Sequence, residues 1–502
     1  MNDVAAKMQI DAAELARRAE GRWLTPPGAL CVTAVEIDSR LCTHGTLFAA
    51  LAGNNADGHD HIQAAAANGA VAALVSRDPG SDPGSDPGSD PGSDPGSAPC
   101  PLLKVDDVQA ALTRLGACGR AAHRMAGGHL VAITGSVGKT GSKEMLAHML
   151  RQLGGCHANR ASFNNHLGVP LTLATLPEVP VTAVQEIGMN AAGEITTLST
   201  LAQPDIAIIT RIANSHAGFF DSLDAIAAAK AEIFDGLIAS GTAILNVDDS
   251  YFSFLCERAK SAGAETIISF GTMKGAAARL LEVAPDDTGM DVTADILGRR
   301  LAFRMGTRGD HWAVNAMAML AAVAALELDV ERAAYSLHDF SELPGRGAVS
   351  QGRFDGLDIT LIDDSYNAGP ASMMAAFATI GDRPPQIMVL SDMLELGAGG
   401  AAAHAALAPA ISALRPRVLI TIGPLMAEMA QSLMAQSLAG GIDHRATNTP
   451  DDATARLRDA IRDGDRIFIK GSNGSGAWRV ATAILDGMAA HAGPNGGTSH
   501  AA

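Results

Sequence analysis

The chain has 502 residues, of which 47% are hydrophobic and 18% are charged, which is enough for about three folded domains with cores of their own. Lysine and arginine number 37 against 54 aspartates and glutamates, a formal net charge of −17. This acidic balance excludes a general binder of nucleic acid or of anionic membranes, while it permits a local basic pocket for phosphates.

The sequence also argues against membrane insertion and secretion. The longest apolar run, residues 316–326, is shorter than the ~20 residues that a membrane-spanning helix needs. Asp3, Asp11 and Glu14 interrupt any signal-peptide core, and none of the cysteines forms a Cys-x-x-Cys pair. We expect a cytoplasmic chain without a disulfide framework or a cysteine-based zinc site. The absence of a coiled-coil pattern favours a monomer.

The first 125 residues predict a small mixed α/β domain that contains an unusual repeat. Residues 78–97 are five tandem Asp-Pro-Gly-Ser units. Proline at every fourth position removes backbone donors, and the glycine that follows it favours a turn. Because the repeat holds no apolar residue, we expect a flexible, solvated loop without a role of its own.

A regular alternation of apolar strands and alanine-rich helices begins at residue 129. Predicted strands end near Ile133, Ile187, Thr210 and Asn246. This alternation predicts a mostly parallel sheet with helices on both faces, in a central domain of residues 126–343.

The alternation restarts after the Gly-Arg-Gly turn at residues 345–347. Further strands are predicted at residues 359–363, 387–391, 418–422 and 466–469, in a last α/β domain of residues 344–490. Residues 491–502 are predicted to be a disordered tail. The sequence therefore predicts an α/β protein of three domains.

A glycine-punctuated turn between a strand and a helix predicts a nucleotide site. Two glycines allow backbone N–H groups to approach a polyphosphate, a lysine supplies a charge for the β- and γ-phosphates, and a threonine hydroxyl can hold Mg²⁺. The spacing is two residues shorter than the common Gly-x₄-Gly-Lys-[Ser/Thr] loop, so an ordinary turn with a surface lysine remains the alternative. The residues concerned are Thr134, Gly135, Ser136, Gly138, Lys139 and Thr140.

This loop and six further motifs resemble the Mur ligases, which build the peptide of bacterial cell-wall precursors, and in particular the members that add D-alanyl-D-alanine. The matches run from about residue 30 to residue 480, in the family's order. The further motifs are Asp38-Ser-Arg40, Ser162-Phe-Asn-Asn-His-Leu-Gly-Val-Pro170, Glu186-Ile-Gly-Met-Asn190, Ala229-Lys-Ala-Glu-Ile-Phe234, Asp363-Asp-Ser-Tyr-Asn-Ala368 and Ser391-Asp-Met-Leu-Glu-Leu-Gly397.

The resemblance implies a fold and an activity. The first domain would bind a UDP-sugar, the central domain would be a P-loop ATPase, and the last would be a Rossmann-like domain that closes over the site. The reaction would join D-alanyl-D-alanine to UDP-N-acetylmuramoyl-tripeptide by an amide bond while ATP becomes ADP and phosphate.

The resemblance also implies ligands for two Mg²⁺ ions. Thr140 and Glu186 would hold one ion, His216 is a candidate ligand of the second, and Lys230 would be carbamylated by CO₂ into a carboxylate-like ligand. Without the family, each residue has a plainer interpretation: Glu186 follows the predicted strand 181–185 as a solvated carboxylate, His216 is an exposed loop histidine, and Lys230 is a solvated lysine on the predicted helix 222–237.

Further residues are implied at the nucleotide and at the two substrates. Arg346 would meet the γ-phosphate when the domains close, and with Lys139 and Lys230 it completes the set implied to be catalytic. His311 and Asn315 would contact adenine and Asp364 the ribose; the alternative for the first pair is a helix N-terminus capped by Asp310, which is compatible with the adenine contact. The residues implied to bind the sugar nucleotide, the peptide and the dipeptide are Ser39, Arg40, Asn164, Asn165, Tyr366 and Asn367.

Two departures from the family's pattern fall near the nucleotide. Trp312 replaces an asparagine of the adenine-contacting region, and Gly141 stands where many relatives carry a second threonine. Neither removes a group that the chemistry requires.

Two other functions compete with this interpretation. One is a sister ligase, either for another muramoyl-peptide or of the folylpolyglutamate type, although the latter lacks a module like the one around Asp38-Ser-Arg40. The other is a nucleotide-gated binding protein that has lost catalysis, which the presence of Lys139, Glu186 and Lys230 disfavours.

Overall fold

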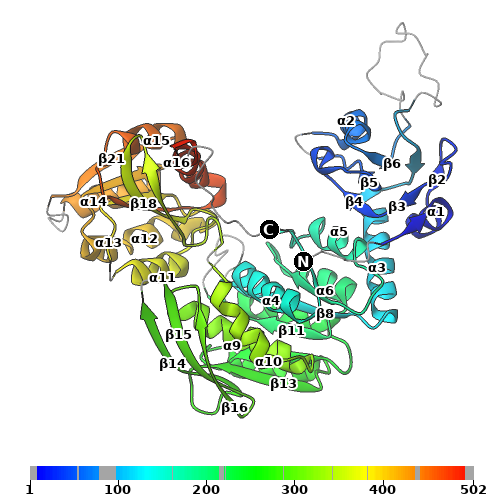
Figure 1. Ribbon diagram of the computed structural model, residues 1–502, viewed down its shortest axis with the longest axis horizontal. Helices are drawn as coiled ribbons and strands as arrows, with labels where there is room; N and C mark the ends of the chain where they lie inside the picture. The colour runs from blue at the N-terminus through cyan, green and yellow to red at the C-terminus, as the bar shows by residue number, and fades with distance from the viewer. Residues whose placement is uncertain are drawn as a thin grey trace, which may run out of the picture.

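The computed structural model describes residues 8–53, 56–78, 98–160, 162–213, 220, 222–286, 288–341, 343–381, 383–435 and 441–491. Three large sheets follow one another along the chain, and helices pack on each of them (Figure 1). The predicted three-part α/β fold is therefore confirmed, while the predicted limits of the domains stay predictions. Of the predicted loop 78–97, only Asp78 lies within the described residues, where it pairs with Lys104 at 3.0 Å.

The first unit contains a five-stranded mixed sheet and a two-stranded ribbon. The sheet has the order β2-β7-β6-β5-β4, with only β2 antiparallel to its neighbour. Its strands are β2 (Arg22–Trp23), β4 (Ala34–Glu36), β5 (Thr46–Ala49), β6 (Ala70–Val75) and β7 (Leu102–Lys104). The ribbon pairs β1 (Ile10–Asp11) with β3 (Cys31–Val32), and the helices are α1 (Ala12–Ala19), α2 (Ile62–Ala67) and α3 (Val108–Met125).

The central sheet has nine strands in the order β16-β15-β14-β13-β12-β11-β8-β10-β9. Strands β8 to β14 pair in parallel, and β14, β15 and β16 form an antiparallel extension that the sequence did not predict. The strands are β8 (His129–Thr134), β9 (Cys156–Ala158), β10 (Thr182–Glu186), β11 (Ile206–Ile209), β12 (Thr242–Asn246), β13 (Thr266–Gly271), β14 (Ala278–Asp286), β15 (Gly289–Ile296) and β16 (Arg299–Met305).

Helices cover both faces of this sheet, because both faces are apolar. Val131 and Ile133 of β8 join one buried cluster, while Leu130 and Ala132 of the same strand join another. The helices are α4 (Lys139–Leu153), α5 (Gly168–Ala174), α6 (Glu194–Ala202), α7 (Leu223–Ala231), α8 (Phe252–Ser261), α9 (Asp310–Ala325) and α10 (Val330–Ser336). The predicted helix 222–237 is therefore interrupted, since a 3-10 helix (Glu232–Gly236) follows α7.

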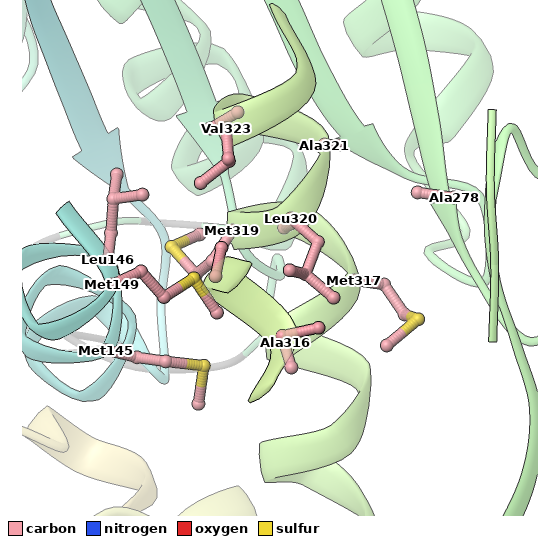
Figure 2. Close-up of a cluster of buried hydrophobic side chains, with 14 of the residues drawn as sticks. Met145, Leu146, Met149, Ala278, Ala316, Met317, Met319, Leu320, Ala321 and Val323 are labelled. Atoms are coloured by element: carbon pink, nitrogen blue, oxygen red, sulfur yellow. The ribbon is translucent and has the colours of Figure 1, made fainter. Parts of the chain in front are cut away.

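Helices α4 and α9 pack against each other in the first of these clusters. Figure 2 shows Met145 and Met149 of α4 close to Met319 of α9, with Ala316 and Leu320 also on α9. All five side chains are fully buried. The two helices are thus held together along their length by apolar contacts.

The last unit has a six-stranded sheet in the order β17-β18-β22-β19-β20-β21, parallel except for the edge strand β17. Its strands are β17 (Ala348–Phe354), β18 (Leu357–Asp364), β19 (Ile387–Ser391), β20 (Val418–Ile422), β21 (Asp443–Thr447) and β22 (Arg466–Lys470), and its helices are α11 (Pro370–Ile380), α12 (Gly400–Ala405), α13 (Ala408–Leu414), α14 (Pro424–Ala435), α15 (Pro450–Arg458) and α16 (Ala477–His491).

The four strands predicted in this unit are present, and two details of the prediction are wrong. The strand predicted at residues 359–363 as the first of the unit is β18, which ends at Asp364 and is the second because β17 precedes it. His491, the first residue of the predicted tail, is the last residue of α16. Residues 492–502 lie outside the described residues. In the part of the chain that the structure describes, no helix is both long and apolar enough to cross a membrane.

Candidate active site

The predicted phosphate loop connects the end of β8 to the start of α4. Gly138 has a φ of 83°, in the left-handed region that glycine adopts without strain. Gly135 has a φ of 149°, and a Cβ on it would lie 2.0 Å from Thr210 Oγ1. The turn therefore requires glycine at both positions, as the predicted approach of a polyphosphate to the backbone also does.

Several polar groups of this loop are buried and lack partners. The hydroxyls of Thr134 and Ser136, and that of Ser142 on α4, have no hydrogen-bond partner within the described residues. Lys139 Nζ donates to the carbonyl oxygen of Gly135 at 2.8 Å, and burial lowers the pKa of this lysine. Unpaired buried hydroxyls are rare in folded proteins, so the loop has the polar groups that a bound phosphate chain would satisfy.

Thr140 and Glu186 form the centre of the site. Thr140 Oγ1 donates to Glu186 Oε2 at 2.7 Å, and Asn164 Nδ2 donates to Glu186 Oε1 at 2.7 Å. The backbone N–H of Glu186 donates to Asn159 Oδ1 at 2.9 Å. Glu186 is only 1% exposed and is the last residue of β10, so the predicted strand 181–185 is shifted by one residue and the solvated-carboxylate interpretation is wrong.

The last unit meets this centre through Arg346 and Tyr366. Arg346 Nη2 donates to Thr140 Oγ1 at 2.9 Å, and its guanidinium carbon lies 4.2 Å from the centroid of the Tyr366 ring. The hydroxyl of Tyr366 donates to Ser162 Oγ at 2.6 Å. Arg346 of the last unit is therefore in direct contact with the phosphate loop of the central unit.

Lys230 lies on α7 and is 1% exposed, so its interpretation as a solvated helix-face lysine is wrong. Burial lowers its pKa well below the usual value, and the charge of Lys139 lowers it further. No hydrogen bond or ion pair to its amine occurs among the described residues. His216, the predicted partner ligand, lies outside the described residues.

Asn315 and His311 occupy the first turns of α9. A Cβ placed on Gly138 would lie 2.9 Å from Asn315 Nδ2, which brings this amide against the phosphate loop. His311 is exposed. The helix is capped by Gly309, and Asp310 is its first residue, so the prediction that Asp310 is the cap is wrong.

Asp364 forms an ion pair at the carboxyl end of β18. Its Oδ2 lies 2.6 Å from Lys470 Nζ, which also donates to the carbonyl oxygen of Asn367 at 3.0 Å. Burial raises the pKa of Asp364, and the charge of Lys470 opposes that shift. The pair thus keeps a carboxylate fixed beside the loop that carries Tyr366.

Four other predicted site residues make contacts within their own units. Arg40 pairs with Asp38 at 2.6 Å, and the carbonyl oxygen of Ser39 accepts from Asn68 at 3.0 Å, both within the first unit. Asn165 Oδ1 accepts the backbone N–H of Gly168, the first residue of α5, at 3.0 Å. In Asn367, the side-chain oxygen accepts the following backbone N–H at 2.9 Å. Except for the one between Ser39 and Asn68, these contacts join residues at most three positions apart, as in turns.

The sequence did not single out Asn159, Ser162 or Lys470 as site residues. Asn159 follows β9 and Lys470 ends β22, so both lie at the carboxyl ends of parallel strands, where sites in open α/β sheets form. That position is a signal that would have identified them. Ser162 stood in a matched motif, but only the contact with Tyr366 reveals its partner.

The donor set suits Mg²⁺. Glu186 and Thr140 offer buried oxygens, the donor type this ion prefers, whereas within the described ranges no three histidine, cysteine, aspartate or glutamate side chains cluster. Mg²⁺ is usually held by one or two protein oxygens together with substrate phosphates and water. The site therefore fits an ion that arrives with a nucleotide.

Comparisons with known proteins agree with this geometry. Family models match in three places: the Mur ligase middle domain over residues 133–323, the glutamate ligase domain of the Mur ligases over residues 345–473, and the Mur ligase family catalytic domain over residues 32–87. The chain therefore belongs to the Mur ligase family and is an ATP-dependent ligase.

Individual relatives show which members of the family the chain is similar to. The UDP-N-acetylmuramoyl-tripeptide–D-alanyl-D-alanine ligase of Mycobacterium bovis is 32% identical, over 90% of this chain and 92% of its own. The solved structure of MurF from Acinetobacter baumannii is 27% identical with a TM-score of 0.78, covering 96% of this chain and all of that one. The MurF ligase from Thermotoga maritima, solved in complex with ADP, shares the fold at 20% identity and a TM-score of 0.67, covering 91% of this chain and 98% of that one.

Proposed function

We propose that this ligase joins D-alanyl-D-alanine to UDP-N-acetylmuramoyl-tripeptide in the synthesis of peptidoglycan precursors, using ATP. The observation that carries the proposal is the Thr140 hydroxyl, which contacts both Glu186 and Arg346. This one atom connects a phosphate loop, a buried carboxylate and the arginine of a second domain. A relative that is 32% identical over 90% of this chain and 92% of its own length carries that activity in its name.

The reaction needs activation because a carboxylate is a poor electrophile. The peptide carboxylate attacks the γ-phosphorus of ATP, which forms an acyl phosphate and releases ADP. The amine of the dipeptide then attacks the acyl carbon through a tetrahedral intermediate, loses a proton, and expels phosphate. Both steps gather negative charge, so positioned cations supply most of the catalysis.

Three basic residues serve as catalytic groups in this proposal. Lys139 binds the β- and γ-phosphates, and Arg346 donates to the transferring phosphoryl group from the last domain. Thr140 and Glu186 would hold one Mg²⁺, and His216 and a carbamylated Lys230 a second. When bound, these ions neutralise charge on the phosphates. The low pKa of Lys230 supports carbamylation, because only the neutral amine reacts with CO₂.

The remaining site residues have binding roles. Thr134, Gly135, Ser136 and Gly138 surround the phosphates, Asn315 and His311 the adenine, and Asp364 the ribose. Ser39 and Arg40 would contact the sugar nucleotide, Asn164 and Asn165 the muramoyl-peptide, and Tyr366 and Asn367 the dipeptide. We further propose a cytoplasmic monomer, which size-exclusion chromatography with light scattering would test.

A panel of amines tests the substrate assignment. The purified enzyme, ATP, Mg²⁺ and UDP-N-acetylmuramoyl-tripeptide are combined with D-alanyl-D-alanine, with single amino acids, or with glutamate, and the products are identified by mass spectrometry. We expect the pentapeptide product with the dipeptide alone. Product formation only with a single amino acid or with glutamate would move the protein to a sister ligase.

Removing the Tyr366 hydroxyl is expected to weaken the contact between the last and central units. Tyr366→Phe deletes one hydrogen bond, worth about 1 kcal/mol, so kcat/KM for the dipeptide should fall roughly 3- to 10-fold. Ser162→Ala should have the same effect, and the double variant should be no worse than either. Tyr335→Phe is the matched control because Tyr335 is exposed. If the two losses of kcat/KM multiply in the double variant, the two hydroxyls act separately.

Deleting residues 79–97 is expected to leave turnover within about twofold of the full-length enzyme, because a repeat of Asp, Pro, Gly and Ser has no apolar side chain to pack against the domain and contains none of the matched motifs. The deletion keeps Asp78 and its pair with Lys104. Steady-state rates with all three substrates, measured beside the full chain, check this expectation. A tenfold loss of kcat/KM for the sugar nucleotide would assign the repeat a role in substrate binding.

A further inference from the structure

Trp312 and Gly141 face each other across the first turns of α9 and α4. A Cβ placed on Gly141 would lie 2.8 Å from Trp312 Cη2 and 2.9 Å from Cζ3, closer than side-chain carbons pack in proteins. The indole is buried, with 5% of its surface exposed. Its outer ring therefore occupies the space that any side chain at position 141 would need.

The indole is also held from other directions. Phe340 packs edge-on against Trp312 with ring centroids 5.7 Å apart. The ring centroid of His148, on α4, lies 5.6 Å from that of Phe340. His148 Nε2 is 2.8 Å from the carbonyl oxygen of Ser336, at the end of α10. Further along α4 and α9, the buried methionines seen in Figure 2 continue the contact. Because interiors are close-packed, the ring cannot retreat without displacing these neighbours.

Both helices begin at the nucleotide site. The first turn of α4 carries Lys139 and Thr140, and Asn315 of α9 lies against Gly138 of the phosphate loop. The separation of the two first turns thus determines where the Asn315 amide lies relative to the phosphate loop.

We propose that Trp312 is a positioning residue for ATP: its ring, seated on Gly141, holds the Asn315 end of α9 at the phosphate loop. The inference rests on the proposed function, since it concerns the same nucleotide site. The same contact links the two departures from the family's pattern, Trp312 and Gly141, because the bulky ring at position 312 requires glycine at position 141.

A reciprocal exchange tests the proposal by binding of ATP. Gly141→Ala adds a methyl group against the indole and should weaken ATP binding on the order of tenfold, although alanine has the higher helix propensity. Trp312→Phe removes the outer ring and should weaken binding a few-fold. In the double variant the methyl group enters the vacated space, so the dissociation constant should return to within about twofold of the native value.

The readouts separate positioning from a general loss of structure. Calorimetry gives the dissociation constant for ATP with Mg²⁺, and kinetics should show a raised KM for ATP with kcat and the KM for D-alanyl-D-alanine within about twofold. Gly400→Ala is the matched control, because a Cβ there would meet only an ordinary contact at 3.4 Å.

Two results would overturn the inference: effects that multiply in the double variant, or equal changes in KM for ATP and for the dipeptide. If Gly141→Ala does not fold, recovery of folding and ATP binding in the double variant supports the inference, and failure of both contradicts it. A native enzyme that binds ATP but turns over no substrate would refute the proposed function, while the coupling in ATP binding would still stand.

Discussion

Lys139→Ala is expected to abolish turnover, with a loss of kcat of at least ~10³-fold. Lys139 begins α4, next to the glycine turn; the residue is half-buried, and desolvation lowers the pKa of its amine. Losing one such preorganised donor costs about 10²- to 10³-fold in other enzymes, and this one also helps to bind ATP. Phosphate release under saturating substrates measures the effect.

The control for this variant is Lys260→Ala, which removes an exposed lysine at the end of α8 and should leave the rate unchanged. Circular dichroism would verify that Lys139→Ala remains folded. A Lys139→Ala enzyme with more than a tenth of the native rate would contradict the assignment of Lys139 to the phosphates.

Lys230→Ala is expected to lose nearly all activity and to recover part of it in added acetate or propionate. The lysine is fully enclosed, its pKa is lowered by burial, and it lies near enough to Lys139 for the two charges to repel. A carbamate at this position would replace a repelling cation with an anion that holds Mg²⁺. A small carboxylate diffusing into the space left by alanine could supply the same oxygens.

Two comparisons make this prediction specific. Lys139→Ala should not respond to carboxylates, since it lacks a cation and not an anion. The native enzyme should lose activity in CO₂-depleted buffer and show a carbamate signal by NMR after exposure to ¹³C-labelled CO₂. Full activity of Lys230→Ala without any carboxylate would refute the metal-ligand role of this lysine.

The sequence predicted the almost wholly buried strands better than the partly exposed ones. Strands β8, β10, β11 and β12 lie in the parallel part of the central sheet and are nearly all buried, and the predicted strand ends fall within one residue of the observed ones. Among the strands that were missed, β16, β17 and β21 lie at the edges of their sheets, whereas β13, β14 and β15 lie inside the central sheet. Each of these six strands mixes buried residues with exposed or half-buried ones. Exposure on one side breaks the apolar run that identifies a strand.

Within the site, the residues whose signal is local in sequence were predicted, and the contacts that depend on tertiary packing were not. The phosphate loop could be predicted because its residues are adjacent in sequence and the turn requires glycine at two of its positions. The contact between Thr140 and Arg346 joins residues 206 positions apart, which no local pattern encodes. The burial of Lys230 depends on which face of an alanine-rich helix packs inward, and the helix has apolar residues on several sides. Tertiary packing decided both.

The most direct test of the account is phosphate release from ATP and Mg²⁺ with UDP-N-acetylmuramoyl-tripeptide, in the presence and absence of D-alanyl-D-alanine. The account predicts sustained release only when both substrates are present, with one pentapeptide product formed for each phosphate. Measurable ATP binding without release under any of these conditions would contradict it and would favour a protein that binds the nucleotide without catalysis.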